Sequence, residues 1–184
     1  MTRSPADLRI PVRRMDFEFP AQLPKYWYRG NPWLTHFFNG MSAVFPDGER
    51  FFIDTVRNYQ DQLTDPELKK HVRAFIGQEA NHGKEHEAFN EQIEQQHGAP
   101  MSRIAKYVKG RLARMRRDLS KERQLAVTIA LEHFTAILAN QLLENPEVMA
   151  DLEATYGDMF VWHAVEETEH KAVAYDVYQQ VGGN

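Results

Sequence analysis

Apolar residues recur at steps of three and four along most of the chain beyond residue 45, which is the spacing of one face of an α-helix. The pattern predicts four long helices and one shorter amphipathic helix. Their approximate bounds are 47–63, 64–97, 120–145 and 158–178 for the long helices and 101–117 for the amphipathic one. No segment has the alternation of a β-strand between turn signals, so we expect an all-α protein.

Turn residues mark the two ends of the second long helix. Thr64 and Glu67 have the spacing of a capping box around Pro66, which predicts a helix start. Gly98 followed by Pro100 predicts a helix end. The helix is therefore bounded on both sides by sequence signals.

Residues 1–45 differ from the rest in holding five of the nine prolines and nine of the 21 aromatic residues. This composition is not that of a regular helix, and disordered tails are poor in aromatic residues. We therefore expect an irregular arm over 1–45, with a short helix at 32–38, packed on a helical bundle over 46–180 as one domain. The aromatic side chains of the arm are expected to fill the core or to roof a pocket.

Charged and imidazole side chains interrupt the apolar stripes of the four long helices. They stand three or four residues from apolar neighbours, on the face that should be buried. These residues are Glu49 on the first long helix, Glu79 and His82 on the second, Glu132 on the third, and Glu167 and His170 on the fourth. At Glu166–Glu167 we choose the second glutamate, because it repeats the spacing from Glu79 to His82.

Four carboxylates that face one core require a strong compensating charge, because an ionised carboxylate buried alone costs several kcal/mol. Two divalent cations supply that charge. One glutamate from each of two helices and a Glu-x-x-His motif from each of the other two form the pattern of four-helix bundles that hold two iron ions. The sequence therefore predicts a di-iron centre with these four glutamates as its catalytic carboxylates.

The positions of the first two glutamates agree with this centre. Glu49 and Glu79 are equally far along the sequence from the turn at Thr64. Antiparallel helices joined at that turn would therefore bring the two carboxylates to the same depth.

The other two glutamates require an interruption between their helices. Glu132 is much nearer in sequence to the turn at Asn145 than Glu167 is. A continuous helix after the turn would therefore place them at different depths. We expect a break at Gly157, with residues 146–157 folded aside.

Composition limits the other function classes. Cysteine is absent, which excludes disulfides, thiolate nucleophiles and cysteine-bound zinc or iron–sulfur clusters. The net charge of -4 argues against nucleic acid as the main partner. No uninterrupted apolar run is long enough for a transmembrane helix or a signal peptide, so we expect a cytoplasmic protein.

The segment His82-Gly83-Lys84-Glu85-His86 supports an alternative function. It matches the short His-x-x-Glu-His pattern of some zinc hydrolases, in which two histidines bind zinc and the glutamate is the general base. In the di-iron interpretation, His86 either binds a metal or holds a neighbouring ligand by a hydrogen bond. Gly83 is unfavourable inside a helix and indicates a close approach by another segment.

Four segments together resemble a bacterial family called predicted metal-dependent hydrolases. They are FPDGE at 45–49, FIGQEANH at 75–82, LEHFTA at 131–136 and WHAVEETEHK at 162–171. The resemblance extends over most of residues 15–180 and implies a bound metal. Members of that family are usually longer at the C-terminus, so the resemblance implies that later helices are missing here.

A more distant resemblance concerns the chemistry. The spacing His163-x-x-x-Glu167-x-x-His170 is similar to the last ligand helix of the arylamine N-oxygenases, which are ferritin-like di-iron enzymes with an extra histidine ligand. The resemblance implies a ferritin-like four-helix bundle and His163 as a third nitrogen ligand. It also implies an arylamine or another electron-rich aromatic substrate.

We therefore expect a non-haem di-iron oxidase or oxygenase with two iron ions, which Mn or Zn would replace, and with O2 as co-substrate. Its substrate would be a small aromatic or amine molecule, and the reaction would need an electron donor as partner. The alternatives are the zinc hydrolase and a non-catalytic iron store or helical interaction module. A homodimer is one candidate oligomeric state.

The segment 101–123 holds nine of the 22 Lys and Arg residues, opposed only by Asp118 and Glu122. A solvated helix face accounts for this pattern. The alternative is contact with an anionic membrane surface or with an acidic partner such as an electron donor.

Overall fold

A computed structural model describes residues 9–150 and 152–182, which form six α-helices, two short 3-10 helices and no strand. The all-α prediction is therefore confirmed for these residues. The α-helices are α1 (Pro32–Arg57), α2 (Pro66–His97), α3 (Met101–Asp118), α4 (Lys121–Glu144), α5 (Ala154–His170) and α6 (Val173–Val181). The 3-10 helices are η1 (Gln60–Gln62) and η2 (Pro146–Val148).

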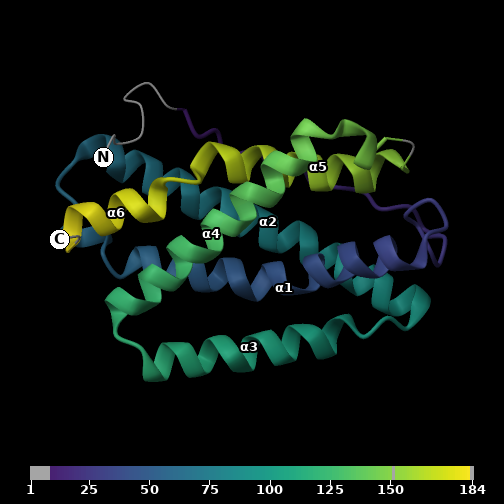
Figure 1. The fold of residues 1–184 in the computed structure, drawn as a ribbon, viewed down its shortest axis with the longest axis horizontal. Coiled ribbons are helices and arrows are strands. Elements are labelled where there is room, and N and C mark those ends of the chain that lie inside the picture. The colour runs from purple at the N-terminus through teal and green to yellow at the C-terminus, as the bar shows by residue number, and fades with distance from the viewer. Residues whose placement is uncertain (1–8, 151, 183–184) are drawn as a thin grey trace.

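The helices pack in sequence-neighbouring pairs around one interior. α1 lies along α2, and α4 lies along α5. Figure 1 shows α4 crossing α1 diagonally, with α3 along one edge of the molecule and α5 and α6 along the opposite edge. Four helices, α1, α2, α4 and α5, therefore contribute side chains to the same interior.

α1 begins and ends earlier than predicted, at Pro32 and Arg57 instead of 47 and 63. The side chain of Asn31 caps it by accepting hydrogen bonds from the backbone N–H groups of Trp33 and Leu34, and Pro32 occupies the first turn. The predicted irregular arm is therefore shorter than 1–45, and its described irregular part covers residues 9–31.

A proline inside α1 is compensated by a contact from α2. Pro46 has no N–H to donate to the carbonyl of Ser42, four residues earlier. The side-chain amide of Asn90 on α2 donates to that carbonyl at 2.9 Å, and the Ser42 hydroxyl donates to Asn90 Oδ1 at 2.7 Å. This contact between helices allows α1 to continue through Pro46, which the sequence pattern alone did not reveal.

The ends of α2 are close to the prediction. Asp65, rather than Thr64, is the capping residue, and its carboxylate accepts from the N–H groups of Glu67 and Leu68. Gly98 ends the helix in the left-handed conformation, with φ of 63°, as expected for a glycine at this position.

The break between α4 and α5 lies earlier than predicted. α4 ends at Glu144, η2 follows, and α5 begins at Ala154. Gly157 is therefore inside α5 and does not mark the break. A second interruption, which the sequence analysis did not predict, separates α5 from α6 at residues 171–172.

Two apolar cores lie on either side of a polar interior. α2 passes through both, with Phe75 in one core and Phe89 in the other. The polar candidate residues of α2 stand between these two phenylalanines. Apolar packing therefore closes the polar interior at both ends along α2.

α4 is the one described helix that is long and apolar enough to cross a membrane by length and composition, although we expected no such segment. Only 22% of its apolar window is buried. Phe134, Ile137 and Leu138 on its outer side are exposed by 62%, 45% and 45%. Core helices that pass the same test are mostly buried, which this window is not, but Glu132 in the middle of α4 is buried and directed to the interior.

We predict that Asn90→Ala lowers the free energy of unfolding by about 1–3 kcal/mol, because the buried carbonyl of Ser42 loses its donor. Chemical denaturation would measure the loss. Asn140→Ala, at an exposed position on α4, is the matched control and should leave stability unchanged. Equal unfolding midpoints for the two variants would contradict the role of Asn90.

Candidate metal centre

Two groups of three side chains each bring their ligand atoms within 4.8 Å of one another. All six side chains are buried, with exposed fractions of 4% or less. The first group is Glu49, His82 and His163, and the second is Glu79, Glu167 and His170. The structure therefore brings together residues that the sequence analysis selected on α1, α2 and α5.

Glu167 lies between the two groups. Its Oε1 atom is 3.1 Å from His163 Nε2 and 3.6 Å from His82 Nδ1 in the first group. The same atom is 3.4 Å from His170 Nε2 in the second group. One carboxylate oxygen thus lies within 3.6 Å of nitrogens from both groups.

Glu132 brings a fourth carboxylate to the centre from α4. Its Oε2 atom is 3.5 Å from His170 Nε2, and its side chain is 2% exposed. Four helices therefore contribute a glutamate each.

Most ligand atoms of the centre form no hydrogen bond, the exception being Glu167 Oε1, which pairs with His163 Nε2 at 3.1 Å. His170 Nε2 lies 3.0 Å from Glu79 Oε1, yet neither atom forms a hydrogen bond. The buried atoms without a partner are both carboxylate oxygens of Glu49, Glu79 and Glu132, Glu167 Oε2, His82 Nδ1 and His170 Nε2. Buried acceptors left in this way are strongly unfavourable, and two divalent cations would satisfy them together. The residues present therefore fit a pair of metal ions.

The protonation of the centre follows from burial. Burial raises the pKa of Glu49, Glu79 and Glu132 above the ordinary carboxyl range, and neighbouring carboxylates raise it further. Burial alone would lower the pKa of His170, but Glu167, Glu79 and Glu132 together outweigh it and the pKa is raised. Burial alone would raise the pKa of Glu167, but His170 and His163 together outweigh it and the pKa is lowered. A metal ion must therefore displace protons from the centre.

Two histidines are held so that one ring nitrogen of each faces the carboxylates. His82 Nε2 is 3.1 Å from Glu166 Oε2, which leaves Nδ1 directed to the centre. His170 Nδ1 is 2.8 Å from Gln78 Oε1, which leaves Nε2 directed to the centre. Holding the outer nitrogen in this way fixes the ring orientation of a metal ligand.

His86 lies behind the centre and is not part of either group. Its Nε2 atom is 2.7 Å from His163 Nδ1, and its Nδ1 atom is 2.8 Å from Ser42 Oγ. Both ring nitrogens are therefore engaged by neighbours, which favours the second of the two roles expected for His86, a hydrogen bond to a neighbouring ligand, over metal binding. Its geometry is that of a residue that orients His163.

Glu85 also faces away from the centre. Its Oε2 atom accepts a hydrogen bond from the backbone N–H of Phe17 at 3.0 Å, and its Oε1 atom is 3.4 Å from Lys84 Nζ. The arrangement of a zinc site built from His82 and His86 with Glu85 as base is therefore not formed.

The N-terminal arm reaches the residues that hold His82. The guanidinium of Arg13 donates to Glu166 Oε1 at 3.0 Å and forms two hydrogen bonds with Glu169, at 2.7 and 2.8 Å. Arg13, Glu166 and His82 thus form one continuous chain of polar contacts. The sequence analysis considered Glu166 only as an alternative ligand, and no local signal marked Arg13.

The arm also reaches the residue that holds His170. The Gln78 side-chain amide donates to the carbonyl of Pro11 and to Glu169 Oε2, each at 2.9 Å. Its Oε1 atom is then free to accept from His170. The arm therefore supports both a histidine of α2 and a histidine of α5.

Gly83 confirms the close approach that its position in a helix indicated. A Cβ atom at this residue would lie 3.2 Å from Glu49 Oε2 and 3.8 Å from Pro46 Cα. Glycine thus lets α1 come near enough to α2 for Glu49 to reach the centre.

The chain belongs to the predicted metal-dependent hydrolase family, whose family model matches residues 11–184. The match includes every residue of the two ligand groups. No curated protein and no solved structure matches the chain.

We predict that Zn(II) affinity increases as pH rises above the ordinary carboxyl range, because the metal-free centre holds protons on carboxyl groups whose pKa values are raised. Each displaced proton contributes about a tenfold gain per pH unit below its pKa. Competition with a chelator of known pH dependence would measure the affinity. Glu49→Gln, which removes one such proton, should give a shallower dependence, and an affinity independent of pH would refute the prediction.

We predict that Arg13→Ala weakens metal binding by about 10–100-fold, because Glu166 loses the cation that fixes it against His82. The number of metal ions per chain and their dissociation constants would be measured by elemental analysis and titration. Arg14→Ala is the control, since Arg14 is the exposed neighbour of Arg13. An equal effect of both substitutions would show that Arg13 acts only through general charge.

Proposed function

We propose that this member of the predicted metal-dependent hydrolases is an enzyme that works through two divalent metal ions bound side by side. Glu167 carries the proposal, because a single one of its oxygens adjoins nitrogens of both ligand groups. Glu49, His82 and His163 would hold one ion, and Glu79, Glu132 and His170 the other. Bound pairs of such ions activate water or polarise a substrate, and iron pairs also supply electrons to O2.

Hydrolysis is the first candidate reaction, and the family description supports it. The residues that would serve it are those of the two groups, since Glu85 is engaged by Phe17 and His86 by Ser42 and His163. Glu49 and Glu132 each have two carboxylate oxygens without a hydrogen bond. One oxygen of each would hold an ion, and the other is suited to accept a proton from water.

Oxidation with O2 is the second candidate reaction, and the origin of the ligands favours it. One glutamate comes from each of α1 and α4, and a Glu-x-x-His motif comes from each of α2 and α5. This is the pattern of ferritin-like proteins that hold two iron ions. In that case the exposed cations of α3, such as Lys106 and Arg111, are the proposed contact for an acidic electron donor.

One experiment tests the metal pair and separates the two reactions. We expect elemental analysis of protein purified without added metal to give two ions per chain. The Zn(II)-loaded protein should hydrolyse members of a panel of uncharged esters and amides, and the Fe(II)-loaded protein is tested in parallel for O2 consumption. O2 consumption without hydrolysis would replace the first reaction by the second.

Glu167→Gln should lose at least one of the two ions, because the shared oxygen then carries no charge. Glu144→Gln, at the exposed end of α4, is the control and should keep both ions. Retention of two ions by Glu167→Gln would contradict the proposal that both ions share the Glu167 carboxylate.

A further inference from the structure

A cavity of about 430 Å³ leads from the surface to the ligand groups. Its walls come from the N-terminal half of α1, the C-terminal half of α4, η2 and α5. Phe37 and Leu138 line it and are themselves about half exposed, so the cavity opens at the surface between α1 and α4. His163 and Glu167 line it as well, one from each ligand group.

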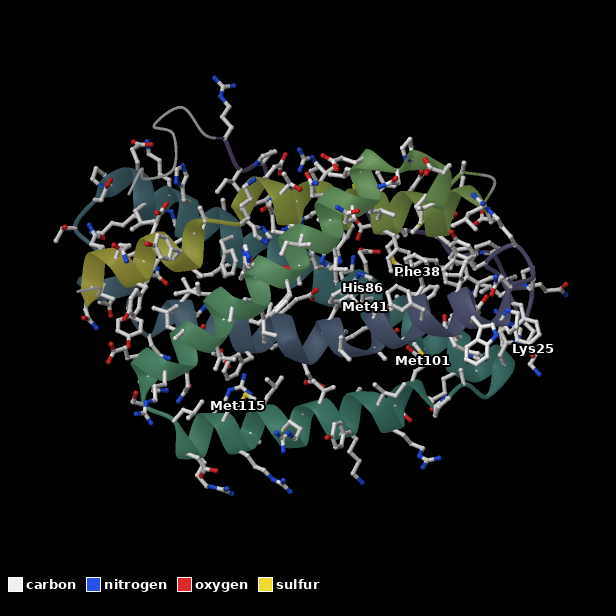
Figure 2. All side chains as sticks on the ribbon, viewed as in Figure 1. Lys25, Phe38, Met41, His86, Met101 and Met115 are labelled. Carbon is white, nitrogen blue, oxygen red and sulfur yellow. The ribbon has the colours of Figure 1, made fainter. Side chains whose placement is uncertain are left out.

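The lining of the cavity is apolar over most of its length. Phe38 and Met41, labelled in Figure 2, form part of the α1 wall. Phe38 also packs against Phe160 of α5, with ring centroids 5.1 Å apart. The other large apolar residues of the lining are Phe37, Phe45, Leu138 and Leu142. Small-molecule sites in proteins have this character, with volumes of roughly 300–1,000 Å³.

The charges of the lining select against anions. No lysine or arginine is among the described residues that line the cavity, and its ionisable residues are Glu147, His163 and Glu167. Two divalent ions at the inner end would be balanced by the four carboxylates of the centre, so a carboxylate or phosphate buried here would meet no net positive charge, which costs several kcal/mol. An ammonium group would lose its hydration along the same apolar walls before it reached the inner end, which is unfavourable.

We propose that this cavity binds an uncharged substrate with an elongated alkyl or arylalkyl body. The apolar body lies along the α1 and α4 walls, and the reacting group lies at the inner end beside His163 and Glu167. The proposal rests on the proposed function, since it names the substrate class of the same centre.

Two small residues offer a way to fill the cavity without changing a ligand. Ala139 on α4 and Ala164 on α5 line it, and each is 5% exposed. Ala139→Phe places an aromatic ring in the path of the substrate. Ala130→Phe is the matched control, since Ala130 is exposed on the same helix and does not line the cavity.

The test uses Zn(II)-loaded protein and three ligands with one alkyl body: decanol, decanoate and decylamine. Each competes with the uncharged fluorescent probe Nile red. We expect decanol to displace the probe at concentrations about tenfold or more below those of decanoate and decylamine. Ala139→Phe should weaken decanol binding by about tenfold or more, while Ala130→Phe leaves it unchanged and both variants keep their metal content.

The outcomes decide between the cavity and other sites. Equal or better binding of either charged ligand would overturn the proposal, and so would decanol binding unaffected by Ala139→Phe, which would locate the ligand elsewhere. If Ala139→Phe does not fold, as judged by circular dichroism, Ala139→Leu should weaken decanol binding in the same direction, and no weakening would count against the cavity.

Different outcomes would refute the metal proposal and the cavity proposal. A protein that binds decanol but retains no metal refutes the metal pair, whereas one that retains two ions and binds no decanol refutes the cavity. With Co(II) in place of zinc, decanol should shift the visible absorption of the metal. An unchanged spectrum would mean that the ligand does not reach the centre.

Discussion

The structure depends on the burial of four carboxylates in one interior. Each of the four helices around that interior contributes one glutamate, and most of the oxygens accept no hydrogen bond. Such a cluster repels itself, so protons or cations must neutralise it before the helices close. The apolar cores on either side hold the helices at fixed distances. Packing therefore determines the geometry of the centre, whereas the charge of the carboxylates determines that it must hold protons or metal ions.

Much of the fold followed from the sequence, because helical periodicity and capping residues are local properties. The ends of α2 and α4 are within a residue or two of the prediction. The start of α1 was missed because Pro46 interrupts the pattern, and the compensating amide comes from Asn90, far away in sequence. The break before α5 was expected from the depths of Glu132 and Glu167. Its end was predicted at Gly157, but α5 already begins at Ala154.

Part of the candidate centre could also be predicted from the sequence, because helical periodicity shows which residues share a helix face. Glu79 and His82, like Glu167 and His170, share a helix face that periodicity reveals, and the structure brings these pairs together. Periodicity cannot distinguish a side chain that faces the centre from one a turn further along, which is why the role of His86 stayed open between metal ligand and hydrogen-bond partner. Arg13 lay beyond any local pattern, because its partners are on α5 at the other end of the chain.

The connection between the arm and α5 has a consequence for the order of assembly during synthesis. The ribosome makes Arg13 among the first residues and Glu166 and Glu169 among the last of the described chain. When the arm leaves the ribosome, Glu166 and Glu169 have not yet been synthesised. His82 and His170, which the arm supports through Glu166 and Gln78, therefore acquire their final orientation only when α5 is complete. Metal loading would accordingly follow the synthesis of α5 instead of guiding the early folding of α1 and α2.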